Sequence, residues 1–251
     1  MSKYMKGFLD NLSTQTHKDL EIILDHNDPT DEEITLVEDY NKEHDNIFHI
    51  VVEGVDPIGV SMNRCIEFAT GDYLCIWNVD DLRTPDSIEI MANVLDENPD
   101  VDVVYGNYNI VSRFGETNGQ YVNVEPHIPE LKTGMILGPF FMFRKSLIKK
   151  SGLFDEQFTC GADYDLALRL VRNGKAHFMP DILGYYLNEG LGQSTRPDSK
   201  QPIERTAIEL RYNTSVIDQS LVGVAQENYD IENISIDDSK IAVSNFVHYK
   251  I

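Results

Sequence analysis

Tyr73-Leu-Cys-Ile-Trp-Asn-Val-Asp-Asp-Leu-Arg-Thr-Pro-Asp86 is the stretch of this chain that says most about its fold. An apolar run, Tyr73–Trp77, ends abruptly in the acidic turn Asn78–Asp81. Over Thr84–Asp86, a capping residue, a proline and an aspartate follow one another, which is typical of a helix start. The pattern predicts a buried strand that carries carboxylates to one edge of a sheet, with a helix after it.

Two interpretations of this acidic turn are open. In open α/β sheets, ligands bind at the carboxyl ends of the strands. Carboxylate oxygens there suit a hard divalent cation, and such a cation suits a diphosphate. The other interpretation is a solvated turn that only caps the next helix. Taken alone, the stretch fits both.

The charge and cysteine content limit the kind of protein this is. The 251 residues include 21 Lys and Arg against 42 Asp and Glu, so the net charge is −21. Such a charge argues against nucleic acid or an anionic membrane as a partner held by bulk electrostatics. Three widely spaced cysteines fit a reducing compartment rather than a disulfide framework or a zinc site. With no apolar run of membrane-spanning length and no signal-peptide core, we expect a cytoplasmic protein without a transmembrane segment.

Helical and strand patterns alternate through the first half of the chain. The rhythm predicts an α/β fold with a mostly parallel, Rossmann-like sheet and helices on both faces. The expected helices are Tyr4–Thr16, Asp31–Glu43, Ile58–Ala69 and Pro85–Asp96, and the expected strands are Leu20–Leu24, Ile47–Val52, Tyr73–Trp77 and Val101–Tyr105.

The second half is more irregular. Residues 114–130 contain glycines and prolines and predict loops. The expected helices are Lys145–Ser151, Asp163–Asn173 and Ile203–Leu221, and the expected strands are Ala176–Met179, Leu183–Leu187 and Ile241–Val247. We therefore divide the chain into a domain of residues 1–220, with halves 1–108 and 109–220, and a C-terminal extension, 221–251, that could add a strand.

A second acidic cluster, Asp163-Tyr-Asp165, follows the turn-like Cys160-Gly-Ala. At a helix N-terminus, backbone N–H groups favour an ionised carboxylate at Asp163. This residue could be an N-cap, or a general base that accepts a hydroxyl proton. Asp165 lies two residues further on, faces elsewhere, and is interpreted as structural.

These parts together resemble a known family. The chain is similar to family 2 glycosyltransferases of the GT-A fold, from about residue 4 to residue 195. The stretches that carry the resemblance occur in the family's order and spacing: Phe8–Thr16, Leu20–Leu24 with Pro29–Asp31, Met62–Arg64 running into Ala69–Tyr73, Asn78–Asp81 with Thr84–Asp86, and Gly161–Arg169.

The resemblance implies roles for three residues in particular. Asp80 takes the last position of the family's D-x-D motif, which holds the divalent metal on the donor diphosphate. Asn78 takes the first position, usually Asp, which contacts the ribose or sugar of the donor. Asp163 takes the position of the catalytic base.

Four further residues are implied at the donor site. His26, Asn27 and Asp28 follow a strand where the family has an acidic pair that contacts the nucleotide base. Since Asp-Gly-Ser-Thr-Asp becomes Asn27-Asp-Pro-Thr-Asp31 here, the residue that reads the base is left open. Arg64 could contact the diphosphate, or be an ordinary exposed helix arginine.

The resemblance implies an inverting sugar transfer from a nucleotide-diphosphate donor to an acceptor hydroxyl, in polysaccharide biosynthesis. The cofactor would be Mn²⁺ or Mg²⁺, and the acceptor a glycan, a lipid-linked group or a protein. The alternative is a non-catalytic GT-A-like module that binds a sugar nucleotide or a partner. The sequence leaves the oligomeric state open.

The family has a strand before the first helix, whereas this sequence starts at that helix. We expect Lys240–Val247, which is apolar and rich in β-formers, to take the place of that strand. A simple edge strand or an unstructured tail is the alternative.

Overall fold

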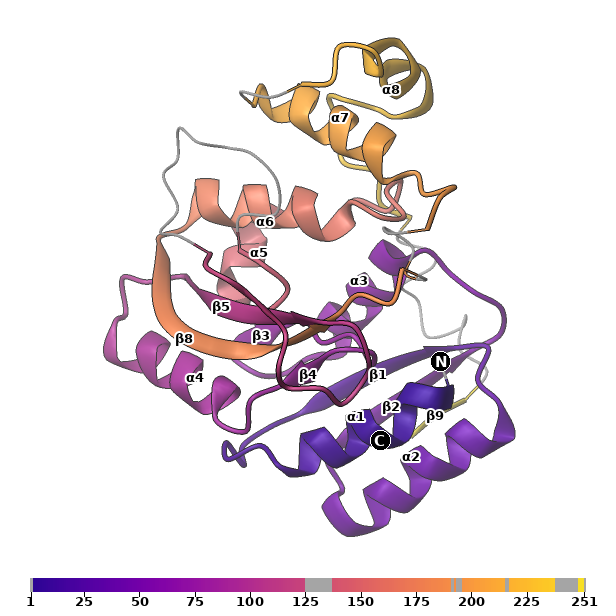
Figure 1. The fold of residues 1–251 in the computed structure, drawn as a ribbon, viewed down its shortest axis with the longest axis vertical. Coiled ribbons are helices and arrows are strands. Elements are labelled where there is room, and N and C mark those ends of the chain that lie inside the picture. The colour runs from indigo at the N-terminus through magenta and orange to yellow at the C-terminus, as the bar shows by residue number, and fades with distance from the viewer. Residues whose placement is uncertain are drawn as a thin grey trace.

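Two β-sheets form the centre of the molecule, which is a computed structural model (Figure 1). The structure describes residues 2–124, 137–190, 192, 196–214, 217–237 and 248–250. The smaller sheet has the order β1 (Ile22–Asn27), β2 (Ile47–Val52), β9 (His248–Lys250). The larger has the order β3 (Tyr73–Cys75), β7 (Phe141–Arg144), β5 (Val103–Val111), β8 (Ala176–Leu187), β4 (Leu82–Arg83), and β6 (Gln120–Val122) pairs with β5.

Parallel pairing is confined to two places. β1 pairs with β2, and β5 pairs with β8, in parallel register. The other pairs in these sheets are antiparallel. The α/β architecture is thus confirmed, although fewer strand pairs are parallel than the βα rhythm predicts. The second half of the chain inserts β7 between β3 and β5, and its short excursion β6 adds a hairpin.

Helices cover both faces of the larger sheet. Because successive side chains of a strand point to opposite faces, β5 sends Val103 and Tyr105 into one core and Val104 into the other. α4 lies on one face and α6 on the other (Figure 1). The helices are α1 (Ser2–Ser13), α2 (Asp31–His44), α3 (Ile58–Phe68), α4 (Ser87–Glu97), α5 (Ile148–Ser151), which follows a 3-10 turn at Lys145–Leu147, α6 (Ala162–Asn173), α7 (Gln201–Tyr212) and α8 (Val222–Asn228).

A third core joins the smaller sheet to the acidic stretch. The buried face of α1 packs on β1 and α2, and the ring of Phe8 lies edge-on to Trp77, with 5.6 Å between centroids. Val79 also packs against this cluster. The helix predicted at the start of the chain therefore buttresses the turn that follows β3.

The predicted boundaries of two helices are wrong, one because of a hydrogen-bond partner far along the chain and the other because of local backbone conformation. Thr84 does not cap α4, because its hydroxyl donates to the carbonyl of Ile182 at 3.2 Å and the helix starts at Ser87 after an uncapped Asp86. The helix predicted over residues 203–221 ends earlier, since Asn213 adopts the left-handed conformation that terminates helices.

The two short strands predicted around residue 180 are one continuous strand. β8 runs through Pro180 because its register against β5 shifts between Gly106 and Asn107. The Asn107 side chain donates to the carbonyl of Pro180 at 2.8 Å, which satisfies the backbone at this irregularity.

The strand expected at the C-terminus falls outside the described residues. The segment Lys240–Val247 lies in that undescribed part. β9, which comes after it, pairs antiparallel with β2 on the side away from β1, so this described piece is an edge strand.

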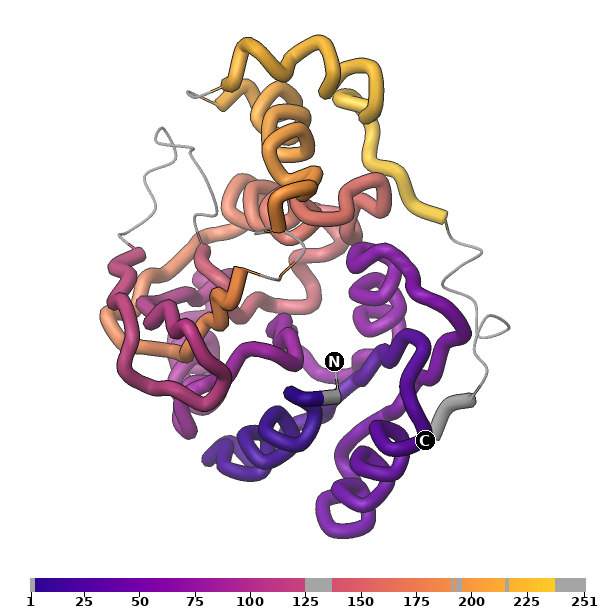
Figure 2. Tube along the Cα trace, turned by 45° about the vertical axis from the view of Figure 1, so that its right-hand side comes forward, coloured from indigo at the N-terminus to yellow at the C-terminus, as the bar shows by residue number. Residues whose placement is uncertain are grey.

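The helices α7 and α8 form a cap at one end of the molecule, from which residues 229–237 run back toward the middle (Figure 2). Arg211 anchors this return. It donates to Asp155 at 2.7 Å and to Asp165 at 2.9 Å, and both carboxylates are fully buried. Asp165 therefore has the structural role that the sequence predicted. No helix within the described ranges is both long and apolar enough to cross a bilayer.

Candidate functional site

The acidic turn after β3 is tied to the end of β8. Asp81 is 3% exposed, and its carboxylate accepts the backbone N–H of Leu187 at 3.0 Å. The indole N–H of Trp77 donates to the Asp81 carbonyl at 2.9 Å. Burial, with the neighbouring charge of Asp80, raises the pKa of Asp81 to about 7. Asp81 thus holds the shape of the turn from inside.

Asp80 and Asn78 are the half-buried members of the turn. Burial raises the pKa of Asp80, and the charge of Glu189 adds to this effect. Among the described residues, the only donor to the Asp80 carboxylate is its own backbone N–H. Asn78 is 3.4 Å from the Asp81 carboxylate through its amide nitrogen. Asp80 is therefore the carboxylate of this turn that has oxygens left for a ligand.

The donor set suits a metal that takes most of its ligands from elsewhere. In the described part of the chain, no three His, Cys, Asp or Glu side chains converge on one point. Mg²⁺ keeps several waters and is commonly bound by one or two carboxylates together with substrate phosphates. The single free carboxylate of Asp80 fits that kind of site.

Glu189 is an acidic neighbour that the sequence analysis missed. It follows β8, accepts from Lys3 at 2.7 Å and from the Tyr4 hydroxyl at 3.0 Å, and links α1 to this edge. Its position two residues after the predicted strand Leu183–Leu187 was the available signal, because strand ends at this edge carry ligand-binding residues.

At the end of β1, Arg64 lies in a buried ionic cluster. Its guanidinium meets Asp25 through Nε at 2.6 Å and Nη2 at 3.1 Å, and Asp56 through Nη1 at 2.6 Å. Its side chain is 1% exposed. The structure thus shows that Arg64 is not an exposed helix arginine, since its N–H groups point to carboxylates, whereas its contact with a diphosphate stays a prediction.

Asn27 braces the same cluster. Its amide nitrogen donates to Asp25 at 2.5 Å and to Ser61 at 2.9 Å, and its oxygen accepts the Asp56 N–H at 2.9 Å. Asp28 comes next, exposed and with a φ of 48°, so its side chain is available at the end of the strand.

His26 points inward instead. It is 7% exposed, and its Nδ1 lies 3.2 Å from Nε2 of the buried His49. Glu33, which also caps α2 through Thr30, is 3.9 Å from the other ring nitrogen. Burial lowers the pKa of His26. The imidazole is buried among these partners, and a contact of His26 with a nucleotide donor stays a prediction.

Asp163 is the second residue of α6. Its carboxylate accepts the Tyr164 backbone N–H at 2.8 Å. Surrounding protein that displaces water raises its pKa, and the charge of Glu204 adds to this effect. The side chain is nevertheless exposed to solvent, so a substrate can reach it.

The predicted residues form three groups. The turn of Asn78 and Asp80 lies against the end of β8, Asn27 and Arg64 share the cluster at the end of β1, and Asp163 opens α6. Among the described residues, no hydrogen bond or ion pair joins Asp80 or Asn78 to Asp163.

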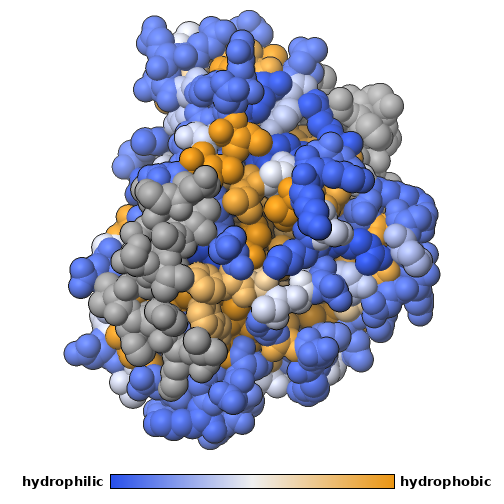
Figure 3. Space-filling view, turned by 180° about the vertical axis from the view of Figure 1, so that it is seen from behind, coloured by the Kyte–Doolittle hydropathy of each residue, from blue (hydrophilic) through white to orange (hydrophobic). Residues whose placement is uncertain are grey.

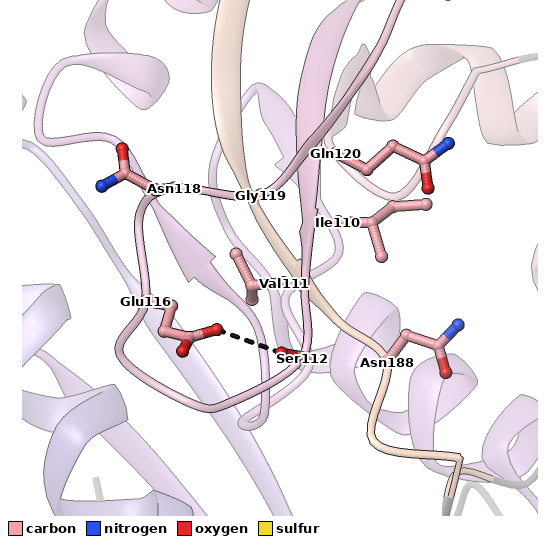
Figure 4. Close-up of a pocket in the computed structure, with 8 residues that line it drawn as sticks. All are labelled: Ile110, Val111, Ser112, Glu116, Asn118, Gly119, Gln120 and Asn188. Carbon is pink, nitrogen blue, oxygen red and sulfur yellow. Dashed lines mark hydrogen bonds between the residues drawn. The ribbon is translucent and has the colours of Figure 1, made fainter.

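A shallow pocket of about 310 Å³ opens at the carboxyl ends of β5 and β8 (Figure 4). Asn188 lies on one side of it and Glu116 and Asn118 on the other, with Ser112 between them and its hydroxyl 3.3 Å from Glu116. The lining residues are Ile110, Val111, Ser112, Glu116, Asn118, Gly119, Gln120 and Asn188. The sequence analysis assigned part of this region to loops and did not predict a pocket.

On the side of the molecule that faces away from the viewer in Figure 1, apolar side chains form a band bordered by polar ones (Figure 3).

Comparison with known proteins is consistent across three measures. The model of the family described as "Glycosyl transferase family 2" matches residues 2–153. The hyaluronan synthase of Pasteurella multocida is 26% identical over 250 residues, which are 97% of this chain and 24% of that protein. The chain spans about three fifths of the length of the first curated relatives, 61% and 59%, which are uncharacterized glycosyltransferases.

Solved structures share the fold. TarS 1-349 of S. aureus, in complex with UDP-GlcNAc, superimposes with a TM-score of 0.67 at 18% identity, covering 90% of this chain and 68% of that one. A mannosyltransferase from Pyrobaculum calidifontis, in complex with GDP-Man and Mn²⁺, gives 0.57 at 17% identity, covering 90% and 65%.

Proposed function

Since the chain belongs to glycosyl transferase family 2, we propose that it transfers a sugar from a nucleotide-diphosphate donor to an acceptor hydroxyl, with inversion and with a divalent metal. The observation that carries this proposal is Asp80. It is a half-buried carboxylate with a raised pKa, held after a strand by its neighbour Asp81, and among the described residues the only donor to its oxygens is its own backbone N–H.

Asp80 would hold Mn²⁺ or Mg²⁺, which would neutralise the charge that develops on the leaving diphosphate. The Pyrobaculum mannosyltransferase was solved with GDP-Man and Mn²⁺, and TarS with UDP-GlcNAc, which supports a nucleotide sugar and a metal here. Asn78, Asn27 and Asp28 are the proposed donor contacts. Arg64 and His26 would act indirectly, by holding the ends of β1 and α2 in place.

Asp163 would be the general base. The acceptor oxygen attacks the anomeric carbon while the bond from that carbon to the diphosphate oxygen breaks, and the acceptor proton passes to the Asp163 carboxylate. A base works best when its pKa lies near the working pH, so the raised pKa and the exposure of Asp163 both favour this role. The relative named hyaluronan synthase favours a glycan as the acceptor.

The test is a nucleotide-release assay. The protein is incubated with Mn²⁺ or Mg²⁺ and a panel that includes UDP-GlcNAc and GDP-mannose, and the free nucleoside diphosphate is measured. We expect metal-dependent release that Asp163→Asn lowers by about 10²–10⁴-fold without weakening donor binding. Asp80→Ala should abolish metal-dependent binding in calorimetry. Asp86→Ala, an exposed aspartate on the same segment, is the matched control.

The competing function is a non-catalytic module that binds a sugar nucleotide. Asn78 favours it, because an amide in the first acidic position lacks the charge of the usual Asp. Tight metal-dependent binding of a donor, without release of diphosphate under any condition, would establish the module and refute the enzyme.

A further inference from the structure

Glu204, on α7, is a fully buried carboxylate with an unusual set of partners. It accepts three successive backbone N–H groups from the loop before α6: Thr159 at 3.0 Å, Cys160 at 2.7 Å and Gly161 at 2.8 Å. The Thr159 hydroxyl donates at 2.7 Å and the Tyr229 hydroxyl at 3.3 Å. Among the described residues, no lysine or arginine pairs with it. Its charge is therefore balanced by backbone and hydroxyl dipoles.

Such an arrangement needs an explanation because an ionised carboxylate is costly to bury. Consecutive N–H groups that converge on one point form an anion-binding nest, and they stabilise the charge. The residue before α6 is Gly161, which has no side chain to cap the helix. The Glu204 carboxylate therefore satisfies the backbone N–H groups that lead into α6, while Asp163 accepts the N–H of Tyr164 in the first turn of the helix.

Close packing fixes the loop against α7. A Cβ atom placed on Gly161 would lie 2.7 Å from Cδ1 of the buried Ile208 and 3.5 Å from the Cβ of Glu204. Only glycine allows the backbone to approach α7 so closely. Asp163 follows two residues later, so its position depends on where this contact sets the start of α6.

We propose that Glu204 is a positioning residue for Asp163: by holding the backbone of residues 159–161, it fixes the start of α6 and the direction of the Asp163 carboxylate. This inference rests on the proposed role of Asp163 as the base. Glu204 also has an electrostatic effect, because its negative charge disfavours ionisation of Asp163 and so makes that carboxylate a stronger base.

The test compares Glu204→Gln and Glu204→Ala with Glu209→Gln. Glu209 is the matched control, since it is also buried on α7 but pairs with Arg205 at 2.7 Å. Glutamine keeps the shape of the side chain, but it offers one acceptor oxygen and turns an NH₂ group toward N–H donors.

We expect Glu204→Gln to lower kcat by roughly 10–10²-fold, as for a catalytic group displaced by about 1 Å, with the donor KM unchanged. The acidic limb of the kcat profile should move to lower pH, because the like charge beside Asp163 is gone. In hydrogen exchange, the amides of residues 159–161 should exchange faster in Glu204→Ala. Glu209→Gln should change neither kcat, nor the position of the acidic limb, nor the exchange of these amides.

The outcomes separate the two proposals. If Asp163→Asn abolishes transfer but Glu204→Gln leaves the pH limb and the exchange of residues 159–161 unchanged, the role of Glu204 is refuted and the base stands. If Asp163→Asn retains transfer, the base is refuted, and with it the positioning role. If Glu204→Ala does not fold, the isosteric Gln variant decides, because a loss of stability alone lowers the amount of active enzyme without moving the pH limb.

Discussion

Arg64→Met should be among the most destabilising single changes within residues 1–108. The side chains of Arg64 and Asp25 are 1% and 2% exposed, and they form two hydrogen bonds to each other. Asp56, the second partner, is 29% exposed. Methionine fills a similar volume but leaves the Asp25 carboxylate buried with a single amide donor from Asn27.

Removal of one partner from a buried pair costs about 3–5 kcal/mol, because it leaves an uncompensated charge. A domain of this size loses about 2–4 °C of Tm per kcal/mol. The melting temperature should therefore fall by roughly 6–20 °C. The exposed pair of Lys6 and Asp10 provides the scale for comparison: their side chains are 73% and 65% exposed, and Lys6→Met should cost about 0–1 kcal/mol.

The double variant Asp25→Val/Arg64→Met isolates the cause. It leaves no buried charge in β1 or α3, and Asp56 can be hydrated. Replacing a buried pair by apolar residues is often neutral or stabilising by about 1–4 kcal/mol, so the double variant should recover most of the loss. Urea unfolding of the four proteins in the cycle gives the coupling free energy.

Donor binding by calorimetry then separates the structural role from the diphosphate contact. If Arg64 acts only through Asp25 and Asp56, the double variant binds the donor as the parent does. A double variant that regains stability and loses donor binding would show that Arg64 contacts the diphosphate. A loss below about 1 kcal/mol for Arg64→Met would show that the pair is solvated and the reasoning from burial is wrong.

Two further predictions concern buried groups. Because burial lowers the pKa of His26, protonation costs more in the folded than in the unfolded chain, so stability should fall as the pH drops below about 6.5, by at most about 1.4 kcal/mol per pH unit for one proton. When the free energy of unfolding in urea is plotted against pH, His26→Asn should flatten the curve and the exposed His44→Asn should not. Equal slopes for the parent and His26→Asn would contradict the assignment. Gly161→Ala should lower the free energy of unfolding by about 1–3 kcal/mol through overpacking against Ile208. In a double-mutant cycle, Ile208→Val should relieve part of this loss. If the two free-energy changes simply add, the side chains at 161 and 208 do not meet.

Hydrophobic periodicity predicted most elements of the first half, because each has one apolar face. β2 occupies the predicted residues, and α2 and α3 differ from prediction by one residue at one end. The larger errors lie where a residue's partner comes from far along the chain. Thr84 is a residue type that often caps helices, but its hydroxyl donates to the carbonyl of Ile182 instead.

The same reason limits what the sequence says of the site. Asp80 and Asp163 carry motif positions and can be found from local pattern. Arg64 cannot be assigned without Asp25, since a helix arginine looks the same whether it faces water or a buried carboxylate. Glu204 gives no local signal at all, because a glutamate near the start of a helix is usually solvated. Its role depends on a loop more than forty residues earlier in the chain.

The treatment of buried acids in this chain points to the same residues as the motifs do. With 42 acidic side chains and 21 basic ones, many carboxylates cannot have a cation of their own. Those placed inside the protein are held: Asp25 by Arg64, Asp165 by Arg169 and Arg211, and Glu204 by backbone N–H groups.

Asp80, Asp81 and Asp163 are treated differently. The pKa of each is raised, chiefly because surrounding protein displaces water from the carboxylate. Asp81 turns inward to the Leu187 N–H, whereas among the described residues the Asp80 carboxylate has only its own backbone N–H as a donor, and Asp163 is exposed. A carboxylate that is partly stripped of water and left without a cation gains most from a bound metal or a transferred proton. The electrostatics of the fold and the family's motif positions are independent observations, and both are consistent with the roles proposed for Asp80 and Asp163.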